Sequence, residues 1–339
     1  ASKGQNLDPA FSPDGRFIAY SSNVSGDFDI WLVDVNGRHQ AKLTSMLGDE
    51  RKPQFSPDGK KIAFIHTTKE GSDLWIVNRD GSSLFRLTKN SASKGVFEWS
   101  SNGELIVYEM LNGSNRSIWF TDIDGMISKL VCAGDCYDPS WGHDGRLVYV
   151  RRTMGEYKLE LVEVSSNSPK QIFSTTREIR LPKFSNDDKR IFFLYQSSER
   201  WNLFVADVLT GDAKDLLEHP PGGVVGGLTW KPILTESSRV LQRPNNPEIV
   251  FSGYSTYERA DLFVVMENGT IELTAGAFGF NVPATRIERL TEKGYKAILD
   301  FAWNPEGSMI VYAAQDDNLL TKIIVRQYVK VKEVSLYGR

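Results

Sequence analysis

Short apolar stretches separated by polar turns run along most of the chain. The runs FIAY at 17–20, IAFI at 62–65 and IVYE at 106–109 are too short for helices and rich in β-branched and aromatic residues. Further runs such as DIWLVD at 29–34 place four apolar residues between two aspartates. Asn-Gly and Asp-Gly pairs between the runs supply the left-handed positions of tight hairpin turns. The pattern therefore predicts antiparallel β-strands joined by hairpins.

One phrase occurs twice, as FSPDGRFIAY at 11–20 and FSPDGKKIAF at 55–64. An aromatic residue at the start of this phrase, followed by a polar turn and an apolar run, recurs in weaker copies along the chain. These anchors are Phe11, Phe55, Trp99, Trp141, Phe184, Trp230 and Trp303. Their spacings are 44, 44, 42, 43, 46 and 73 residues, so the repeat has one period and a single enlarged unit.

Four short strands repeated at this period are typical of a β-propeller. Seven anchors predict an all-β fold, a seven-bladed β-propeller of four-stranded antiparallel blades, with residues 1–339 forming a single domain. No window has sustained helical periodicity with caps, which argues against a separate helical domain. We expect the ring to close by side-chain packing between the first and last blades, with residues 1–7 as a possible added strand at that seam.

The sixth unit contains extra residues at two places. One expected insertion, about 231–247, separates Trp230 from the strand at 248–251, where other units have a four-residue turn. A second, about 269–285, follows the run DLFVVM. Both are expected on one face of the ring, unless TIELT at 270–274 is the fourth strand, which would move the second insertion to the other face.

The aromatic anchor with Ser-Pro-Asp-Gly, the IAF or IAY strand, the DIW strand, the Gly turn and a terminal Leu-Thr together resemble the TolB-type propeller repeat. The resemblance covers essentially the whole chain. It implies the propeller fold and an extracytoplasmic, periplasmic location. Related propellers occur in prolyl-oligopeptidase-like peptidases and in oligogalacturonate lyases, so the resemblance implies several different functions.

Composition excludes some classes of partner. The formal charge of -3 and the pI near 5.9 provide no extended positive field for a nucleic acid. No apolar stretch is long enough to span a membrane, and the first ten residues lack the apolar core of a signal peptide. Cys132 and Cys136 are compatible either with a small disulfide loop, which would favour an oxidising compartment, or with two free buried thiols.

The residues needed for catalysis are scarce. The chain has no Gly-x-Ser-x-Gly sequence of a peptidase nucleophile. Its four histidines, His39, His66, His143 and His219, do not pair at metal-ligand spacing. We therefore expect no catalytic residues, no cofactor and no metal.

Loops between second and third strands share one face of a propeller, and there the fourth to sixth units are rich in arginine and large aromatic residues. Such residues dominate binding hot spots. The candidate binding residues are Arg151, Arg152, Tyr157, Arg200, Trp201, Tyr254, Tyr257 and Arg259. We expect them to bind an acidic peptide, a carboxylate or a sugar acid; the alternative is that the aromatic residues cover blade edges while the arginines are solvated.

The predicted function is a non-enzymatic scaffold that binds a protein or peptide in the bacterial cell envelope. One alternative is a polysaccharide-processing propeller of the oligogalacturonate-lyase kind. A second is a substrate-gating propeller of a larger oligopeptidase-type protein.

Overall fold

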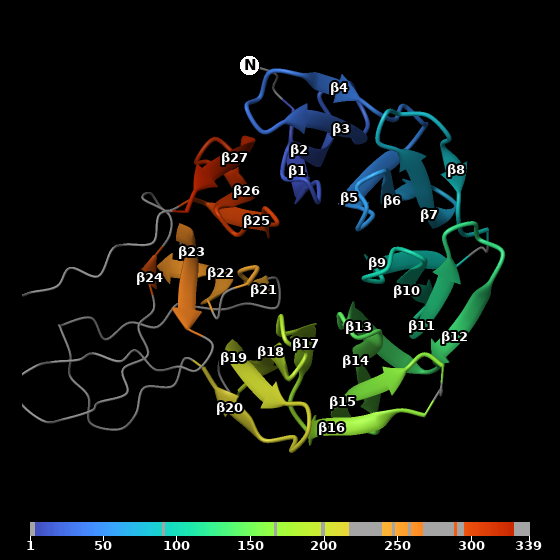
Figure 1. Ribbon diagram of the computed structural model, residues 1–339, viewed down its shortest axis with the longest axis vertical. Coiled ribbons are helices and arrows are strands. Elements are labelled where there is room, and N and C mark those ends of the chain that lie inside the picture. The colour runs from blue at the N-terminus through green and yellow to red at the C-terminus, as the bar shows by residue number, and fades with distance from the viewer. Residues whose placement is uncertain are drawn as a thin grey trace, which may run out of the picture.

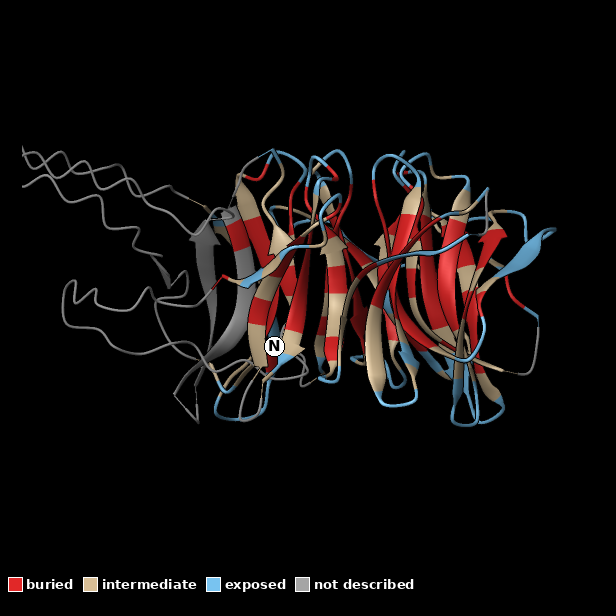
Figure 2. Ribbon diagram, turned by 90° about the horizontal axis from the view of Figure 1, so that it is seen from below, coloured by how far each residue is buried: buried red, intermediate tan, exposed pale blue. Residues whose placement is uncertain are grey.

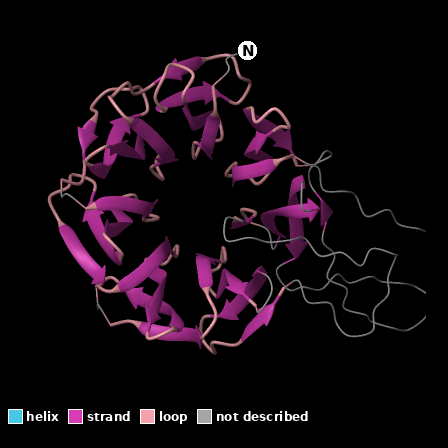
Figure 3. Cartoon of the chain, turned by 180° about the vertical axis from the view of Figure 1, so that it is seen from behind, coloured by secondary structure: helices cyan, strands magenta, loops and turns pink. Residues whose placement is uncertain are grey.

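A computed structural model gives the fold of the protein. It describes residues 4–89, 92–165, 168–197, 201–216, 239–245, 248–256, 259–266, 288–289 and 295–328. Within these ranges the secondary structure consists of strands and the turns that join them (Figure 3). No helix of the length and apolarity needed to cross a membrane occurs in this part of the chain.

The described strands form seven antiparallel sheets around a common axis, here called blades one to seven in chain order (Figure 1). Blade one contains β1 (Asn6–Phe11), β2 (Phe17–Ser22), β3 (Asp29–Asp34) and β4 (Gln40–Lys42). Blade two contains β5 (Asp49–Phe55), β6 (Lys61–Thr68), β7 (Gly71–Asn78) and β8 (Phe85–Arg86). Blade three contains β9 (Ser93–Trp99), β10 (Leu105–Asn112), β11 (Asn115–Asp122) and β12 (Ser128–Cys132).

The other four blades complete the ring. Blade four contains β13 (Asp135–Trp141), β14 (Arg146–Thr153), β15 (Glu156–Glu163) and β16 (Lys170–Thr175). Blade five contains β17 (Ile179–Phe184), β18 (Arg190–Gln196), β19 (Trp201–Asp207) and β20 (Ala213–Asp215). Blade six contains β21 (Val240–Gln242), β22 (Glu248–Thr256), β23 (Arg259–Met266) and β24 (Glu288–Arg289). Blade seven contains β25 (Ala297–Trp303), β26 (Met309–Gln315) and β27 (Thr321–Gln327).

The sequence predicted seven blades with four strands each, and the number of four-stranded blades was wrong. Six sheets have four strands, and the last sheet has three within the described residues. The segment KEVSL, where the sequence suggests a further outer strand, lies beyond Tyr328 and outside those residues.

Strands within each blade follow chain order from the axis outward, so the ring has two distinct faces. The turns between first and second strands lie on one of them, which we call the turn face. The loops between second and third strands and the links between blades lie on the other, which we call the link face. Buried positions concentrate in the middle of the strands, and exposed positions gather at both faces (Figure 2).

The repeated phrase forms the turn between the first and second strands. In blade one, Ser12 Oγ accepts a hydrogen bond from the Phe17 amide (2.9 Å) and donates one to Asp14. Gly15 takes the left-handed φ of 67° that closes the turn. Successive turns also touch, since a Cβ at Gly59 would stand 3.2 Å from the Pro13 ring. The phrase is thus a structural device that closes hairpins and packs neighbouring blades.

Blades one and seven meet through side chains. Phe11 and Ile18 of blade one form a buried cluster with Val311 of blade seven. The Asn6 side chain also donates a hydrogen bond to the Thr321 carbonyl (3.4 Å). Residues 6–11 form the innermost strand of blade one and do not extend blade seven.

Blade six differs from the expectation. The expected anchor Trp230 lies outside the described residues. Gln242 occupies the anchor position of blade six, because it pairs with Ile249 as Phe11 pairs with Ile18 in blade one. The turn that follows β21 begins at Arg243, and Asn245 has a left-handed φ of 57°. The prediction that residues 231–247 form an insertion in that turn was therefore wrong, because β21 occupies part of this range.

The long connections of blade six also leave from different faces. β20 ends and β21 begins on the link face, whereas β23 ends and β24 begins on the turn face, as the up-and-down order requires. The second expected insertion, 269–285, lies between β23 and β24 but outside the described residues. The prediction of a single protrusion concerns residues outside the described part of the chain and stays a prediction.

Candidate functional site

Arg152 and Tyr157 face each other across the hairpin of β14 and β15. They are directly opposed in the strand register, and the Arg152 guanidinium carbon lies 5.5 Å from the centre of the Tyr157 ring. The turn is made by Met154 and Gly155, both with left-handed φ values of 50° and 83°, which suits a two-residue hairpin. Met154 is fully exposed at its tip. The structure thus brings two of the candidate binding residues together.

Arg151 lies on the opposite side of β14, because successive side chains of a strand alternate. Its guanidinium is 3.8 Å from the Glu160 carboxylate, which also accepts a hydrogen bond from the Tyr149 hydroxyl (2.9 Å). Glu160 is buried, so this ion pair joins the surface to the interior of blade four.

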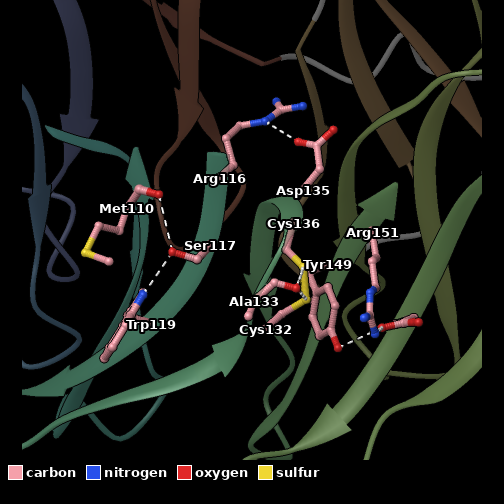
Figure 4. The surroundings of a disulfide bond; sticks show 11 residues. Met110, Arg116, Ser117, Trp119, Cys132, Ala133, Asp135, Cys136, Tyr149 and Arg151 are labelled. Carbon is pink, nitrogen blue, oxygen red and sulfur yellow. Dashed lines mark hydrogen bonds and ion pairs between the residues drawn. A yellow bond between two sulfur atoms is a disulfide. The ribbon is translucent and has the colours of Figure 1, made fainter. Parts of the chain in front are cut away.

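Asp135 connects two arginines from different blades. It begins β13 and accepts a hydrogen bond from Arg116 Nε of β11 (2.9 Å; Figure 4). Arg152 Nη1 lies 3.8 Å from its other oxygen. The side chain of Arg152 is 51% exposed, so it remains accessible from the link face.

Tyr137 lies between Arg116 and a further arginine, Arg180. Its ring is buried, with the guanidinium carbon of Arg116 at 3.8 Å and that of Arg180 at 5.5 Å from the ring centre. Burial raises the pKa of the Tyr137 hydroxyl above its ordinary value, although Arg116 opposes the rise. The phenol thus stays neutral and acts as a platform for cations.

Arg180 is held by two acids. Its Nε donates to Asp138 Oδ2 (2.8 Å), and its Nη1 is 3.7 Å from Glu178. Burial disfavours the charge on Arg180, but Asp138, Glu178 and Tyr137 together outweigh this effect, and the pKa of the guanidinium is raised. Arg116, Arg152 and Arg180, which meet around Asp135 and Tyr137, form what we call the arginine cluster, on the link face of blades three to five.

Sequence reasoning missed Arg116 and Arg180. Arg116 lies at the start of β11 in the third unit, whereas the candidate residues were chosen from the fourth to sixth units, and Arg180 lies in an inner strand rather than in a loop. The sequence signal for Arg116 was present in the loop EMLNGSNR, whereas Arg180 joins the cluster only because β13 and β17 are adjacent.

The other expected residues lie elsewhere. Trp201 begins β19 and packs against the cluster of Leu194 and Leu203 between blades five and six, so it covers apolar side chains there. Tyr254 lies in β22 and Arg259 in β23, and their side chains are outside the description, as are Arg200 and Tyr257 altogether.

Cys132 and Cys136 form a disulfide bond beside the arginine cluster, with Cα atoms 6.2 Å apart (Figure 4). Of the two alternatives that the sequence left open, a small disulfide loop or two free thiols, the structure has the disulfide. It joins the end of β12 to β13, and Asp135 and Tyr137 flank Cys136 in β13. The disulfide therefore fixes the strand that presents both residues to the arginines.

The disulfide replaces a polar contact found in the first two blades. Thr44 and Thr88 hold the corresponding position at the end of a blade and accept hydrogen bonds from the Ile30 and Leu74 amides (2.8 and 3.0 Å). Cys132 lies opposite Ile118 in the same register. The disulfide and the hydrogen bond from Thr44 to Glu50 of β5 (3.0 Å) thus tie the end of one blade to the start of the next, whereas the Thr88 contact stays within blade two.

A metal centre has no support among the described residues, where no three His, Cys, Asp or Glu side chains converge in a way that could hold an ion. The arginine cluster is suited to binding oxyanions, because guanidinium groups present paired donors that match a carboxylate.

Comparison with known proteins supports the fold. An oligogalacturonate lyase in complex with manganese superposes with a TM-score of 0.70 at 12% identity, over 97% of this chain and 91% of that one. The propeller domain of the Trilobed protease from Pyrococcus furiosus, which has an open velcro topology, gives 0.66 at 14% identity, over 100% and 99%. TolB from Acinetobacter baumannii gives 0.55 at 16% identity, over 83% and 65%.

These identities establish the shared fold alone. No curated protein sequence matches the chain. The family model described as the TolB beta propeller domain matches residues 1–181, which is more than half of the chain and includes the strands that carry the arginine cluster as far as Arg180. The protein therefore belongs to the TolB beta propeller domain family.

Proposed function

We propose that this protein is a non-enzymatic propeller scaffold that binds an acidic segment of a protein or peptide through the arginine cluster. The observation that carries the proposal is the half-exposed Arg152, which stacks beside Tyr157 and shares Asp135 with Arg116. Arginine and tyrosine bury large areas and donate directed hydrogen bonds, so they favour protein recognition. We also propose that residues 1–339 form one domain.

The neighbouring acids do not cancel this binding capacity. Asp138 and Glu160 are buried and already engaged, and Asp135 is shared between two guanidinium groups. A ligand carboxylate can replace the weak 3.8 Å contact of Arg152 with Asp135 without leaving a buried charge unpaired, because both groups are partly exposed.

An extracytoplasmic location is part of the proposal. The family and the Cys132–Cys136 disulfide support it, since structural disulfides persist mainly in oxidising compartments. Alkylation of thiols in protein taken directly from cells tests this point. The expected result is that Cys132 and Cys136 react only after reduction, whereas ready alkylation without reductant would contradict it.

A direct binding experiment tests the function. A fluorescent peptide rich in Asp and Glu should bind the protein and raise its anisotropy, and Arg152→Met should weaken binding by about tenfold, the loss of one charged hydrogen bond. Arg38→Met is the matched control, because Arg38 is an exposed arginine in the β3–β4 turn on the turn face. Binding that is equal in all three proteins, or absent for every acidic peptide, would refute the proposal.

The same preparation separates the alternatives. Conversion of polygalacturonate to unsaturated products in the presence of manganese, the ion in the similar lyase, would favour a polysaccharide-processing propeller. Coding sequence for a hydrolase domain beyond Arg339 would favour a gating propeller of a larger peptidase.

A further inference from the structure

Four aromatic side chains lie between the outer strands of blades four and five. They pack against the buried cluster of this seam, and each keeps part of its ring exposed; they are Tyr157, Phe173, Tyr195 and Phe204, which we call the aromatic surface. β16 of blade four carries Phe173 and lies beside β19 of blade five, which carries Phe204 (Figure 1). Because the blades radiate from the axis, their outer strands stand further apart than their inner strands, which leaves these rings within reach of solvent.

Ring contacts join three of these residues into one patch. The ring centres of Tyr195 and Phe204 are 4.5 Å apart, and those of Phe173 and Tyr195 are 6.5 Å apart in an edge-on arrangement. Tyr195 lies one residue before the end of β18, and β18 ends at the link face. The patch therefore reaches the face on which the arginine cluster lies.

Tyr157 connects the patch to the arginine cluster. It pairs with Arg152 of β14 on one side and with Thr175 of β16 on the other, so these three side chains lie on the same face of blade four. Phe173 is two residues before Thr175 in β16 and belongs to that face as well. The guanidinium of Arg152 and the ring of Phe173 thus lie on the side of blade four that is directed toward blade five.

The charges around the aromatic surface are complementary to an acid. Arg177, in the link between β16 and β17, adds an exposed cation to those of the arginine cluster. The neighbouring acids are paired with cations of their own. Glu178 lies 3.7 Å from Arg180. Glu156 lies 3.3 Å from Lys158. A ligand that combines an acid with an apolar ring therefore matches both the charge and the exposed aromatic area, the two features that dominate protein recognition.

We propose that the partner of the arginine cluster is an extended peptide segment in which an aromatic residue follows an acidic residue by two positions. Residues two apart in an extended chain project to the same side, about 7 Å from each other. The acid then accepts hydrogen bonds from Arg152, while the ring packs on the aromatic surface in offset or edge-to-face contacts. This inference rests on the proposed function and specifies the sequence that the partner presents.

Three fluorescent peptides of one length provide the test. The first has Phe two residues after each Asp or Glu, the second has Ser in place of Phe, and the third keeps Phe but has Asn and Gln in place of the acids. In anisotropy titrations the first should bind about tenfold more tightly than the second, the factor expected for partial burial of one ring. The third should bind more weakly than the first by a similar factor, because it lacks the charged hydrogen bond to Arg152.

Phe173→Leu and a matched control, Phe85→Leu, locate the ring of the ligand. Both residues are partly buried phenylalanines on the outermost strand of a blade, and Phe85 packs in the seam of blades two and three. Phe173→Leu should reduce the preference for the first peptide over the second to about threefold, the loss of one aromatic pair, and Phe85→Leu should leave it unchanged. Tyr195→Leu repeats the test nearer the link face, and the melting temperature of each variant reports whether it is folded.

The outcomes separate this inference from the proposed function. Equal binding of the first and second peptides, with Arg152→Met still weakening both, overturns the inference alone. The same holds if Phe85→Leu and Phe173→Leu reduce the preference equally. Saturable binding of polygalacturonate without binding of the first peptide would assign the surface to a sugar acid and overturn it too. If no acidic peptide binds, or if Arg152→Met has no effect, the proposed function fails and the inference fails with it.

Discussion

Lys183 Nζ lies 2.7 Å from Glu98 Oε2, although the two residues belong to blades that are not neighbours. Glu98 is in β9 of blade three and Lys183 is in β17 of blade five, so the ion pair spans the inner strand of blade four. Both residues directly precede an aromatic anchor, Trp99 and Phe184, and therefore occupy the same level around the axis. At this level blade four has the small, buried Ser140. The pair thus joins blades three and five across the inner strand of blade four.

A double-mutant cycle should reveal this coupling. Glu98→Gln, Lys183→Met and the double variant are expected to give an interaction free energy of about 0.5–1 kcal/mol, because the pair is partly exposed. Urea unfolding at low and high salt measures it, and the value should fall with added salt. A coupling indistinguishable from zero at low salt would show that the pair does not tie the blades together.

Glu50 should make stability depend on pH. Burial raises its pKa from 4.5 to about 8, Asp29 adds to the rise, and a hydrogen bond from Thr44 opposes it. The folded protein therefore retains a proton that the unfolded chain loses, so the contribution of Glu50 is fully present below pH 4.5 and is lost as pH rises to 8. The slope is about 1.4 kcal/mol per pH unit within that window.

Glu50→Gln keeps the shape of the side chain and removes its titration. The free energy of unfolding of the original protein minus that of the variant should decrease steadily between pH 5 and 8, in urea titrations at each pH. A difference that is constant over this interval would mean that Glu50 ionises normally in the folded protein.

Removal of the Cys132–Cys136 disulfide should destabilise the protein by about 2 kcal/mol, the loop entropy expected for so short a ring. Cys132→Ser combined with Cys136→Ser is expected to lower the melting temperature. Reductant should lower that of the original protein to the same level and leave the variant unchanged. If reductant has no effect on the original protein, the bond does not stabilise this seam.

Alanine substitutions at two glycines separate the cost of backbone strain from the cost of a steric clash. Gly26 and Gly48 have similar φ values of 127° and 119°, but only a Cβ at Gly48 would lie 2.4 Å from the Thr67 carbonyl oxygen. Gly26→Ala should cost about 1–3 kcal/mol from strain alone. Gly48→Ala should cost about 1–3 kcal/mol more, because the carbonyl has to move. Equal losses in urea unfolding would refute the predicted contact.

The sequence by itself determined the blade and its repetition. The turns are local: Ser12, Asp14 and Gly15 satisfy one another within a few residues, and Gly59 and Gly103 repeat the left-handed conformation at φ 69° and 73°. Local hydrogen bonds and backbone preferences are readable without tertiary contacts. Arg152 and Tyr157 were predictable for the same reason, since a two-residue hairpin places them opposite each other.

In blade six the local signal was misleading. The sequence TWKP at 229–232 imitates an anchor followed by proline, whereas the structure uses LQRPNNP at 241–247, in which Pro244 takes the place of Pro13 and the anchor position holds the polar Gln242. An aromatic anchor was therefore not required there, and only the pairing of β21 with β22 decided the register.

The tertiary structure alone decided which distant residues meet. Arg116, Tyr137 and Arg180 come from three blades, and Glu98 and Lys183 are separated by 85 positions in the chain. The left-handed bulge at Asp138, with φ 51°, directs its carboxylate to Arg180 in the next blade. Closure of the ring and the register of its inner strands fix such contacts, and neither is encoded in any single repeat. This is why the repeats identified the fold, while the arginine cluster and the aromatic surface emerged from the assembled ring.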